Sequence, residues 1–568
     1  MSLNRREFMR LLAMAGAAGM TVNSQVFGDA GVEYDLPTFG NLSLLHFTDC
    51  HAQLMPVHFR EPNINIGIGD AFGQPPHVVG EHFLKHFDIA AGSAKAHAFT
   101  YLDFEAASRK YGKVGGFAHL ATLVKRLRAL RPNSLLLDGG DTWQGSATSL
   151  WTHGQDMVDA CKLLGVDIMT GHWEFTYGMD RVREIIDEHL LPIEFLAQNI
   201  MLTEDASFEG KPAFDEESGQ VFKPYTIREM NGIPVGIIGQ AFPYTPVANP
   251  RYMVPTWSFG IREKAVRKRV AAARAAGAEL VVLLSHNGFD VDRKLASRVD
   301  GIDVILTGHT HDAIPEAIKV NNTLLVASGS HGKFLARLDL DVQGGRVKDY
   351  RFKLIPILSD VIKSDQEMAG IIQKIRAPHE KKIRRVVGRA DSLLYRRGSF
   401  NGTFDDMICD ALLEERDAEI ALSPGFRWGG SLLPGQDITV EDIFNQTAIT
   451  YPNAYRSEFT GAFLKEILED VADNLFNTDP YYQQGGDMVR VGGMGYTINT
   501  NNPMGKRISG MTLLKTGKPI EATKNYVVSG WASVNEGTKG PPVYDVVTKY
   551  IEKKKAINIP PNQNIRIK

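Results

Sequence analysis

Short hydrophobic runs recur between residues 42 and 327, and most of them end in a polar turn that contains glycine. Their short length and their content of Val, Ile and Leu are typical of buried β-strands. The runs cover residues 42–48, 134–137, 166–170, 193–197, 233–239, 279–284, 302–306 and 324–327. Apolar residues at helical spacing lie between several of them, at 117–130, 157–164 and 263–276. Strands that alternate with helices predict an α/β sheet domain.

Acidic residues and histidines follow five of these predicted strands. Ligands of α/β sheets bind at the carboxyl ends of the strands, where such side chains would meet. One Asp or His at a strand end is more often structural than functional, whereas five converging ends favour a bound cation. The five stretches are Asp49-Cys50-His51, Gly140-Asp141, Gly171-His172-Trp173-Glu174, Ser285-His286 and Gly308-His309-Thr310-His311.

The chain of 568 residues is too long for one hydrophobic core, so we expect two or more domains. We predict a targeting segment at residues 1–30, the domain with the cation site at 31–360, a linker helix at 361–387 and a smaller domain at 388–568. Residues 56–112 are polar and glycine-rich without a clear period, which predicts a long irregular insertion. The linker is one charged helical stretch from about residue 365 to 385.

The composition excludes several classes of protein. Hydrophobic residues at 43% and charged residues at 23% are ordinary for a globular protein. The chain has 63 Lys and Arg against 66 Asp and Glu, so positive charge is not in excess. We therefore expect no nucleic-acid partner. Three cysteines without a C-x-x-C motif do not make a disulfide framework. We expect no membrane anchor, because no segment is long and apolar enough to span a bilayer.

The N-terminus has the features of an export signal. Arg5 and Arg6 are followed by Phe8 and then by a mildly apolar stretch at residues 11–22. This order resembles the twin-arginine signal, which carries folded proteins, often with metal already loaded. We therefore expect the protein in the periplasm. A basic amphipathic N-terminus is the alternative.

The ordered set of five motifs resembles the calcineurin-like metallophosphoesterases, and within them the two-domain 5′-nucleotidase family. The resemblance covers nearly the whole chain after the signal. It implies a two-layered β-sheet metallophosphoesterase domain, an αββα sandwich, followed by a smaller α+β C-terminal domain like that of the 5′-nucleotidases.

The resemblance also implies two divalent metal ions that share a bridging Asp141. Asp49, His51 and one of the two histidines His309 and His311 would hold one metal. His172, His286 and the other histidine would hold the second. Ligands with oxygen and nitrogen donors suit Mn, Fe or Zn, and the sequence alone does not choose among them. The resemblance of the third motif described below implies a centre with two manganese ions.

A pair of close cations fits one kind of chemistry. Such cations lower the pKa of a bridging water and neutralise the charge that builds on an attacked oxyanion. The substrate is therefore expected to be an anionic ester or anhydride centred on phosphorus or sulfur, with Asp141 as a catalytic residue.

The third motif departs from the family. The 5′-nucleotidases have Gly-Asn-His-Glu-Phe-Asp there, in which the His and the Asp form a dyad that supports the transition state. Here Trp173 and Thr176 stand at the two dyad positions, and indole is only a neutral donor. An inactive relic is one interpretation, but the intact metal set favours a substrate that does not need the dyad. A thiolate or persulfide leaving group is a stable anion and needs little protonation.

This replaced dyad resembles the SoxB thiosulfohydrolases, a sulfur-oxidation branch of the same family. Residues 49–54 and 60–67 resemble that branch as well. The resemblance implies release of sulfate from thiosulfate carried on a cysteine of a SoxYZ carrier protein. We expect that carrier as the partner and a monomeric enzyme.

The smaller domain carries further candidates. Arg427 lies where the family has a substrate arginine, and its guanidinium suits the oxygens of a sulfonate. We also expect Trp173 and Tyr177 to contact substrate. The base-stacking motif of the family is absent, with residues 532–537 near its place. Gly485-Gly486-Asp487 would line a channel for an extended arm or form a turn.

Two rival functions stay open. One is a 5′-nucleotidase or cyclic-nucleotide phosphodiesterase. The other is a metal-dependent binding protein that captures the carrier without turnover. Hydrolysis assays on AMP and on the thiosulfonated carrier separate all three.

Overall fold

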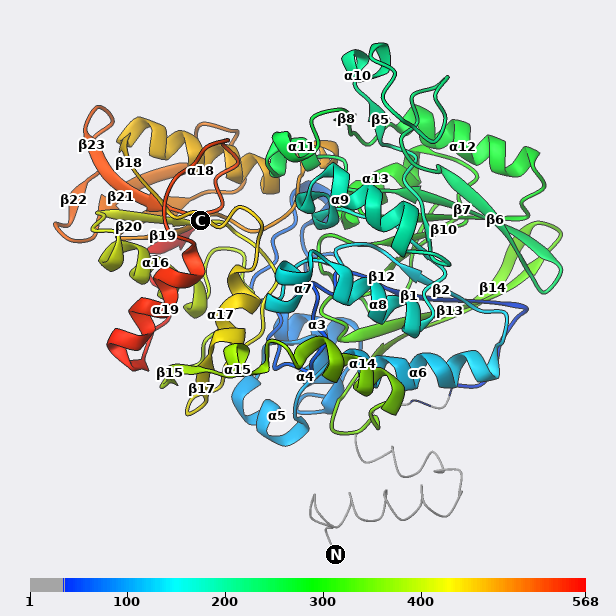
Figure 1. Ribbon diagram of the computed structural model, residues 1–568, viewed down its shortest axis with the longest axis horizontal. Helices are drawn as coiled ribbons and strands as arrows, with labels where there is room; N and C mark the ends of the chain where they lie inside the picture. The colour runs from blue at the N-terminus through cyan, green and yellow to red at the C-terminus, as the bar shows by residue number, and fades with distance from the viewer. Residues whose placement is uncertain (1–33, 35) are drawn as a thin grey trace, which may run out of the picture.

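The computed structural model describes residue 34 and residues 36–568, so the predicted signal at 1–30 lies outside the described residues. The chain forms two lobes that lie side by side (Figure 1). The larger lobe contains the N-terminal part of the described chain and the smaller one the C-terminal part. No helix among the described residues has both the length and the apolar character needed to cross a membrane.

Two six-stranded sheets form the centre of the larger lobe. The first has the order β14-β13-β1-β2-β3-β4, with bounds Arg346–Pro356, Phe334–Gln343, Leu42–Phe47, Leu135–Asp138, Ile168–Met169 and Glu194–Phe195. The second has the order β11-β12-β10-β9-β7-β6, with bounds Ile318–Val320, Thr323–Ala327, Val304–Thr307, Leu280–Ser285, Ile233–Gln240 and Tyr225–Met230. β1 to β4 are parallel, and so are β7, β9, β10 and β12.

The two sheets pack face to face, and helices cover their outer faces. One buried cluster contains Leu44 of the first sheet and Val282 of the second, so it fills the space between the sheets. The next residue of β1, Leu45, belongs to a different cluster together with the covering helices. Successive side chains of a strand point to opposite faces, so a strand buried on both sides is a continuous apolar run. The predicted αββα sandwich is confirmed.

The covering helices have clear bounds. α6 (Phe117–Leu130), α8 (Gln155–Leu164) and α14 (Gln366–Arg376) cover the first sheet. α12 (Glu263–Ala275) and α13 (Phe289–Arg298) cover the second. The shorter elements of this lobe are η1 (Gly69–Ala71), α7 (Ala147–Thr152), η2 (Trp173–Tyr177), α9 (Met179–Glu184), η3 (Ile185–His189), α10 (Glu204–Phe208), α11 (Thr245–Ala248), η4 (Arg251–Met253) and the strand pair β5 (Met201–Leu202) and β8 (Trp257–Ser258).

Two predictions were wrong, one about the insertion at 56–112 and one about the linker at 361–387. The insertion at 56–112 contains the helices α3 (Gly80–His86), α4 (Ala94–Phe99) and α5 (Phe104–Tyr111). Helices this short are stabilised by tertiary packing rather than by their own periodicity, and buried Phe83 and Phe99 supply that packing. The linker is not one helix, because α14 ends before Pro378 and α15 (Glu380–Ile383) begins after it. Proline lacks the N–H that would continue the helix.

The smaller lobe combines three small sheets with four helices, as expected of an α+β domain. Its sheets are β17-β15-β24 (Asp437–Thr439, Val386–Ala390, Ala556–Ile557), β18-β23-β16-β19 (Tyr455–Thr460, Asn525–Gly530, Ile420–Ser423, Arg490–Gly492) and β22-β21-β20-β25 (Lys518–Pro519, Ile508–Leu513, Met494–Ile498, Ile565–Ile567). Its helices are α16 (Thr403–Glu415), α17 (Val440–Thr447), α18 (Gly461–Phe476) and α19 (Val543–Lys554), with the short η5 (Pro480–Tyr482).

Candidate metal centre

The strand ends that carry the predicted ligands meet at one edge of the sandwich. In the first sheet Phe47 at the end of β1 pairs with Asp138 at the end of β2. In the second sheet Ser285 at the end of β9 pairs with Thr307 at the end of β10. The strands therefore end level with one another, and the turns that follow them bring all seven predicted ligands together.

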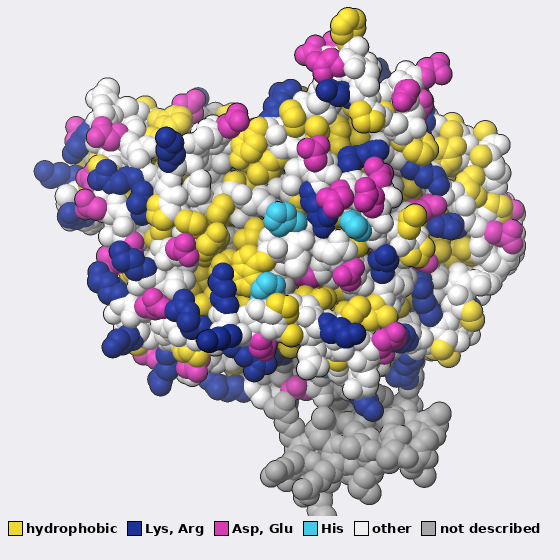
Figure 2. Space-filling model, in the orientation of Figure 1, with side chains coloured by type: hydrophobic (Ala, Val, Ile, Leu, Met, Phe, Trp, Pro, Cys, Tyr) yellow, Lys and Arg dark blue, Asp and Glu magenta, His cyan; other side chains and the backbone are white. Residues whose placement is uncertain are grey.

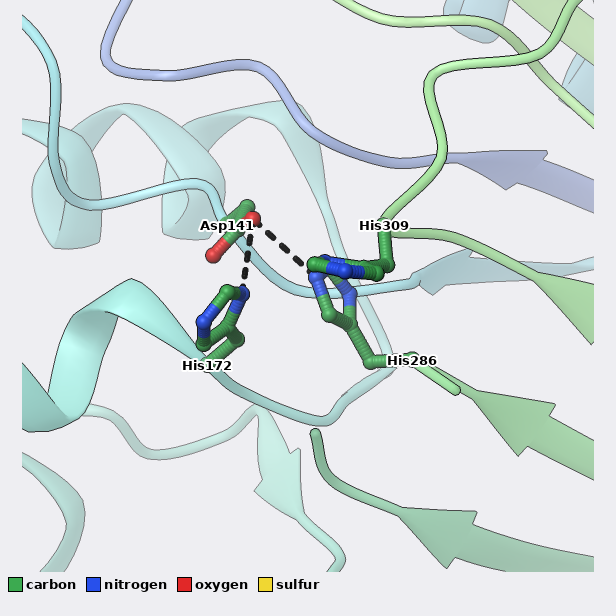
Figure 3. Close-up of side chains that lie close together, drawn as sticks. All are labelled: Asp141, His172, His286 and His309. Carbon is green, nitrogen blue, oxygen red and sulfur yellow. Dashed lines mark hydrogen bonds and ion pairs between the residues drawn. The ribbon is translucent and has the colours of Figure 1, made fainter. Parts of the chain in front are cut away.

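The seven residues form two groups that share Asp141. In each group one ligand atom per residue lies within 4.8 Å of the others. The first group is Asp49, His51, Asp141 and His311, and the second is Asp141, His172, His286 and His309, which Figure 3 shows converging. The sequence left the order of the last two histidines open, and the structure places His311 in the first group and His309 in the second.

Asp141 lies at the centre of both groups. Its Oδ2 atom is 3.0 Å from His286 Nε2, 3.1 Å from His172 Nδ1 and 3.7 Å from His51 Nε2. Burial raises the pKa of this carboxyl, but the neighbouring His172 and His286 outweigh burial and hold the pKa well below its ordinary value. Asp141 is therefore an anion in contact with both ligand sets, which is the position that a bridging carboxylate requires.

The donor atoms fit a pair of divalent cations. His51 Nε2 and His311 Nε2 lie only 3.1 Å apart, so a proton or a cation must separate their lone pairs. Burial holds the pKa of His311 well below its usual range, the neighbouring His51 ring adds to that shift, and the His311 ring is neutral. Neutral imidazole and carboxylate oxygen are the donors that Mn, Fe and Zn accept. His309 Nδ1 is buried without a protein partner, which leaves its lone pair for a metal.

The backbone of the ligand turns is strained. Five of the seven ligands have a left-handed φ although none is glycine: Asp49 (53°), His51 (45°), Asp141 (57°), His309 (78°) and His311 (59°). Such residues cost about 1–3 kcal/mol each, and they persist where the surrounding structure compensates. Their concentration in one site is typical of a functional centre.

Glu174 ties two of the ligand turns together. Its buried carboxylate accepts hydrogen bonds from the backbone N–H of His172 (2.7 Å), Thr142 (2.6 Å), Trp143 (3.2 Å) and Asp141 (3.3 Å). One carboxylate therefore fixes the turn after β2 against the turn after β3. Glu174 positions His172 and Asp141 and is not itself in either ligand group.

A cavity of about 290 Å³ opens from the metal centre between the two lobes. Hydrophobic side chains gather where the lobes meet on the face shown in Figure 2. The wall combines aromatic rings, one arginine and several ligand residues. It includes His51, Asp141, His172, His309, His311, Trp173, Phe242, Asn249, Phe426, Arg427, Trp428, Gly485, Gly486 and Asp487. The interpretation of Gly485-Gly486-Asp487 as lining for a channel is thus favoured over a plain turn.

Two of the three predicted substrate contacts lie in this wall. Trp173 is 6% exposed and packs against Phe426 and Trp428, with ring centroids 5.0 and 4.7 Å apart. Arg427 donates from Nε to Asp487 Oδ1 (3.0 Å) and from Nη1 to the Thr310 carbonyl (2.8 Å). Its guanidinium is therefore fixed beside the ligand turn of His309 and His311.

Tyr177, the third predicted contact, is not part of the wall. Its hydroxyl donates to the Trp143 carbonyl at 3.0 Å and lies 2.8 Å from Ser149 Oγ, and its ring stacks on His153. Burial raises the pKa of this phenol. The structure therefore gives Tyr177 a packing position outside the cavity.

Three further residues lie at the site and were not predicted from the sequence. Trp428 stacks on the His51 ring at 5.2 Å, and Arg397 donates to the Thr310 carbonyl at 3.3 Å, the same acceptor that Arg427 uses. Asn249 lies 3.4 Å from His172 Nε2. Trp428 adjoins Arg427, so its position could have been suspected. Arg397 and Asn249 come from loops without a motif.

Comparisons with known proteins agree with this geometry. The family model described as 5′-nucleotidase, C-terminal domain, matches residues 386–548. The solved structure of sulfate thiohydrolase SoxB from Thermus thermophilus, in complex with glycerol, is 33% identical with a TM-score of 0.89. That match covers 94% of this chain and 98% of the other. The chain belongs to the 5′-nucleotidase family.

More distant members of the 5′-nucleotidase family share the architecture. A solved 5′-nucleotidase precursor, also from Thermus thermophilus, is 21% identical with a TM-score of 0.71, and the match covers 93% of this chain and 99% of the other, which shows the fold alone. The rat 5′-nucleotidase is 26% identical over 500 residues, with 78% of this chain and 84% of the relative covered. The chain is thus a metallophosphoesterase-type hydrolase with two candidate metal sites.

Proposed function

We propose that this protein releases sulfate from a cysteine S-thiosulfonate carried by a SoxYZ-type protein. The observation that carries the proposal is the cavity wall beside Asp141. Trp173 stands there in place of a histidine, and Thr176 bonds to the Trp173 carbonyl at 2.7 Å outside the cavity. The two described residues at the dyad positions of the family, Trp173 and Thr176, would give a leaving group no His–Asp assistance, which suits a persulfide that departs as a stable anion.

The proposed reaction breaks one bond and forms one. The bond between the sulfonate sulfur and the persulfide sulfur breaks, and the sulfonate sulfur gains an oxygen from water. The carrier keeps a persulfide anion, sulfate departs, and two protons pass to solvent. Arg427 would bind the sulfonate oxygens, since its fork suits a tetrahedral oxyanion. Trp173, Phe426 and Trp428 would enclose the disulfide portion of the substrate and exclude water from it.

Two divalent cations, manganese in our proposal with zinc and iron as alternatives, would occupy the two ligand groups around Asp141. When bound, such cations lower the pKa of water and neutralise the charge of the oxyanion. Metal analysis of the purified protein tests this part independently of any substrate. A protein that folds but binds fewer than two metals would contradict it.

The rival nucleotidase function has support of its own, because the rat and bovine 5′-nucleotidases are 26% and 24% identical to this chain. The experiment compares sulfate release from the thiosulfonated carrier with phosphate release from AMP, at equal metal content. We expect turnover of the carrier and little of AMP. Brisk hydrolysis of AMP without sulfate release would replace our proposal by the nucleotidase. Tight capture of the carrier without turnover would replace it by the binding protein.

We further propose delivery to the periplasm by the twin-arginine route. Replacement of Arg5 and Arg6 by lysine keeps the charge but removes the pair that defines the signal. The variant should accumulate in the cytoplasm, as measured by fractionation and immunoblotting. Delivery equal to that of the wild type would point to another route or to no export signal.

A further inference from the structure

His309 is the one candidate ligand, among the seven described above, whose second ring nitrogen is bonded to the smaller lobe. Its Nε2 atom donates to the backbone carbonyl of Gln484 at 2.7 Å. Its Nδ1 atom is buried and has no protein partner. The carbonyl therefore selects the tautomer with the proton on Nε2, and it leaves the Nδ1 lone pair free for a metal.

The residue after Gln484 fits closely against the same ring. A Cβ atom added to Gly485 would lie 2.5 Å from His309 Nε2 and 2.9 Å from its Cδ2 atom. On another side the ring of Phe242 lies 4.2 Å from that of His309, centroid to centroid. The imidazole is thus held between a side chain of the larger lobe and bare backbone of the smaller lobe.

The loop that carries Gln484 is itself attached to the larger lobe. Asp479 forms an ion pair with Lys294 at 2.5 Å, and the hydroxyl of Tyr481 donates to Glu263 at 2.9 Å. Tyr244 donates to the carbonyl of Tyr481. These contacts place the carbonyl of Gln484 against His309, so the position of the loop and the orientation of the ligand depend on each other.

We propose that the smaller lobe completes the metal centre through Gln484 and Gly485. In this inference both are positioning residues: they orient His309 for the cation shared by Asp141, His172, His286 and His309. The inference rests on the metal assignment of the proposed function but not on the sulfur substrate. Because binding free energies are reciprocal, occupancy of this group should in turn stabilise the loop.

The first experiment compares Gly485→Ala with Gly486→Ala. Both glycines have a left-handed φ, 75° and 80°, so alanine strains the backbone equally at either position. Only Gly485 touches His309, since the nearest atom to a Cβ on Gly486 is the Gly425 carbonyl oxygen at 3.6 Å. Manganese affinity is measured on metal-free protein by competition with a chelator, and circular dichroism checks the fold of both variants.

We expect Gly485→Ala to weaken one of the two manganese sites by about 10–100-fold, the range typical of lost outer contacts to a ligand, and to leave the other site unchanged. Gly486→Ala should bind both ions with the affinities of the wild type. Equal affinities in Gly485→Ala and wild type, or equal losses in the two variants, would overturn the inference. A wild type that binds no metal would instead overturn the metal assignment.

The second experiment uses the unmodified chain and therefore does not depend on the folding of a variant. Amide hydrogen exchange is followed across residues 479–487 with and without manganese, and β18 (Tyr455–Thr460) serves as the reference segment of the same lobe. Manganese should slow exchange in the loop at least several-fold and leave β18 unaffected. Identical loop exchange in the two states would contradict the coupling.

Discussion

At the scale of single residues, Asp141 has the contacts of a bridging ligand. Its Oδ2 atom lies 3.1 Å from His172 and 3.0 Å from His286 of the second ligand group, and 3.7 Å from His51 of the first. Asp141→Asn removes the negative charge that both cations would share. We expect loss of bound metal and a fall in turnover of more than about 100-fold, beyond the effect of an outer contact. Asp159→Asn, on the exposed face of α8, is the matched control. Two tightly bound metals in Asp141→Asn would remove this residue from the site.

Trp173 and Thr176 decide which leaving group the site favours. The double variant Trp173→His with Thr176→Asp restores the residue types of the nucleotidase dyad. Support of an alkoxide by such a dyad is worth roughly 10²–10⁴ in rate, whereas a persulfide gains little from it. The variant should therefore gain activity toward a simple phosphate ester and none toward the thiosulfonate.

That comparison is made at equal metal content and with thermal unfolding as a check, because both side chains are buried. Loss of the indole also removes contacts to Phe426 and Trp428, so turnover of the thiosulfonate should fall. A double variant that gains on the thiosulfonate would contradict the leaving-group argument.

At the scale of elements, the centre depends on turns that are held in strained conformations. The turn after β2 and the turn after β3 are joined by the four backbone hydrogen bonds of Glu174. Burial raises the pKa of this carboxyl, and the N–H groups oppose that shift. The bonds therefore stabilise an anion that the interior would otherwise disfavour.

Glu174→Gln tests this role, because it keeps the shape but replaces one acceptor oxygen by a donor that faces N–H groups. Hydrogen bonds to charged groups are worth about 1.5–3 kcal/mol each. We expect a loss of about 3 kcal/mol in stability, seen as a fall of several degrees in the thermal transition, together with weaker metal binding. Glu184→Gln on the surface helix α9 is the control. An unchanged transition and unchanged metal content would show that the turns hold without this carboxylate.

At the scale of the whole molecule, the insertion at 56–112 links the two lobes. The guanidinium of Arg60 lies over the ring of Tyr101 at 4.9 Å within the insertion and over that of Tyr395 in the smaller lobe at 4.1 Å. Ile64, Ile66 and Ile68 pack against a core cluster of the smaller lobe. The insertion therefore joins the two lobes, although none of its residues lines the cavity at the metal centre.

Arg60→Gln should loosen this link. A desolvated contact between a cation and an aromatic face is worth about 2 kcal/mol, and glutamine cannot replace it. We expect faster hydrogen exchange in residues 57–68 and a lower thermal transition. Arg60→Lys, which keeps a cation, should lose less. If the two variants behave equally, the cation–aromatic contacts of Arg60 do not hold the lobes together, and the link rests on the packing of Ile64, Ile66 and Ile68 alone.

The strands and the ligand types followed from the sequence alone. Buried parallel strands are continuous apolar runs, and the polar residues directly after them are fixed to the sheet edge by chain connectivity. The positions of Asp49, His51, Asp141, His172 and His286 are local properties of this kind. The break between α14 and α15 in the linker also has a local cause, because Pro378 lies between the two helices.

Only the tertiary structure decided what depends on contacts between distant segments. It assigned His311 to the group of Asp49 and His51, and His309 to the group of His172 and His286. It placed Tyr177 outside the cavity and brought in Arg397, Trp428 and the Gln484 carbonyl. Every residue has a backbone carbonyl, so the sequence does not single out the carbonyl of Gln484. Side chains on loops follow no periodic pattern, so their contacts cannot be predicted from spacing. Their roles arise from packing between lobes, which no local pattern encodes.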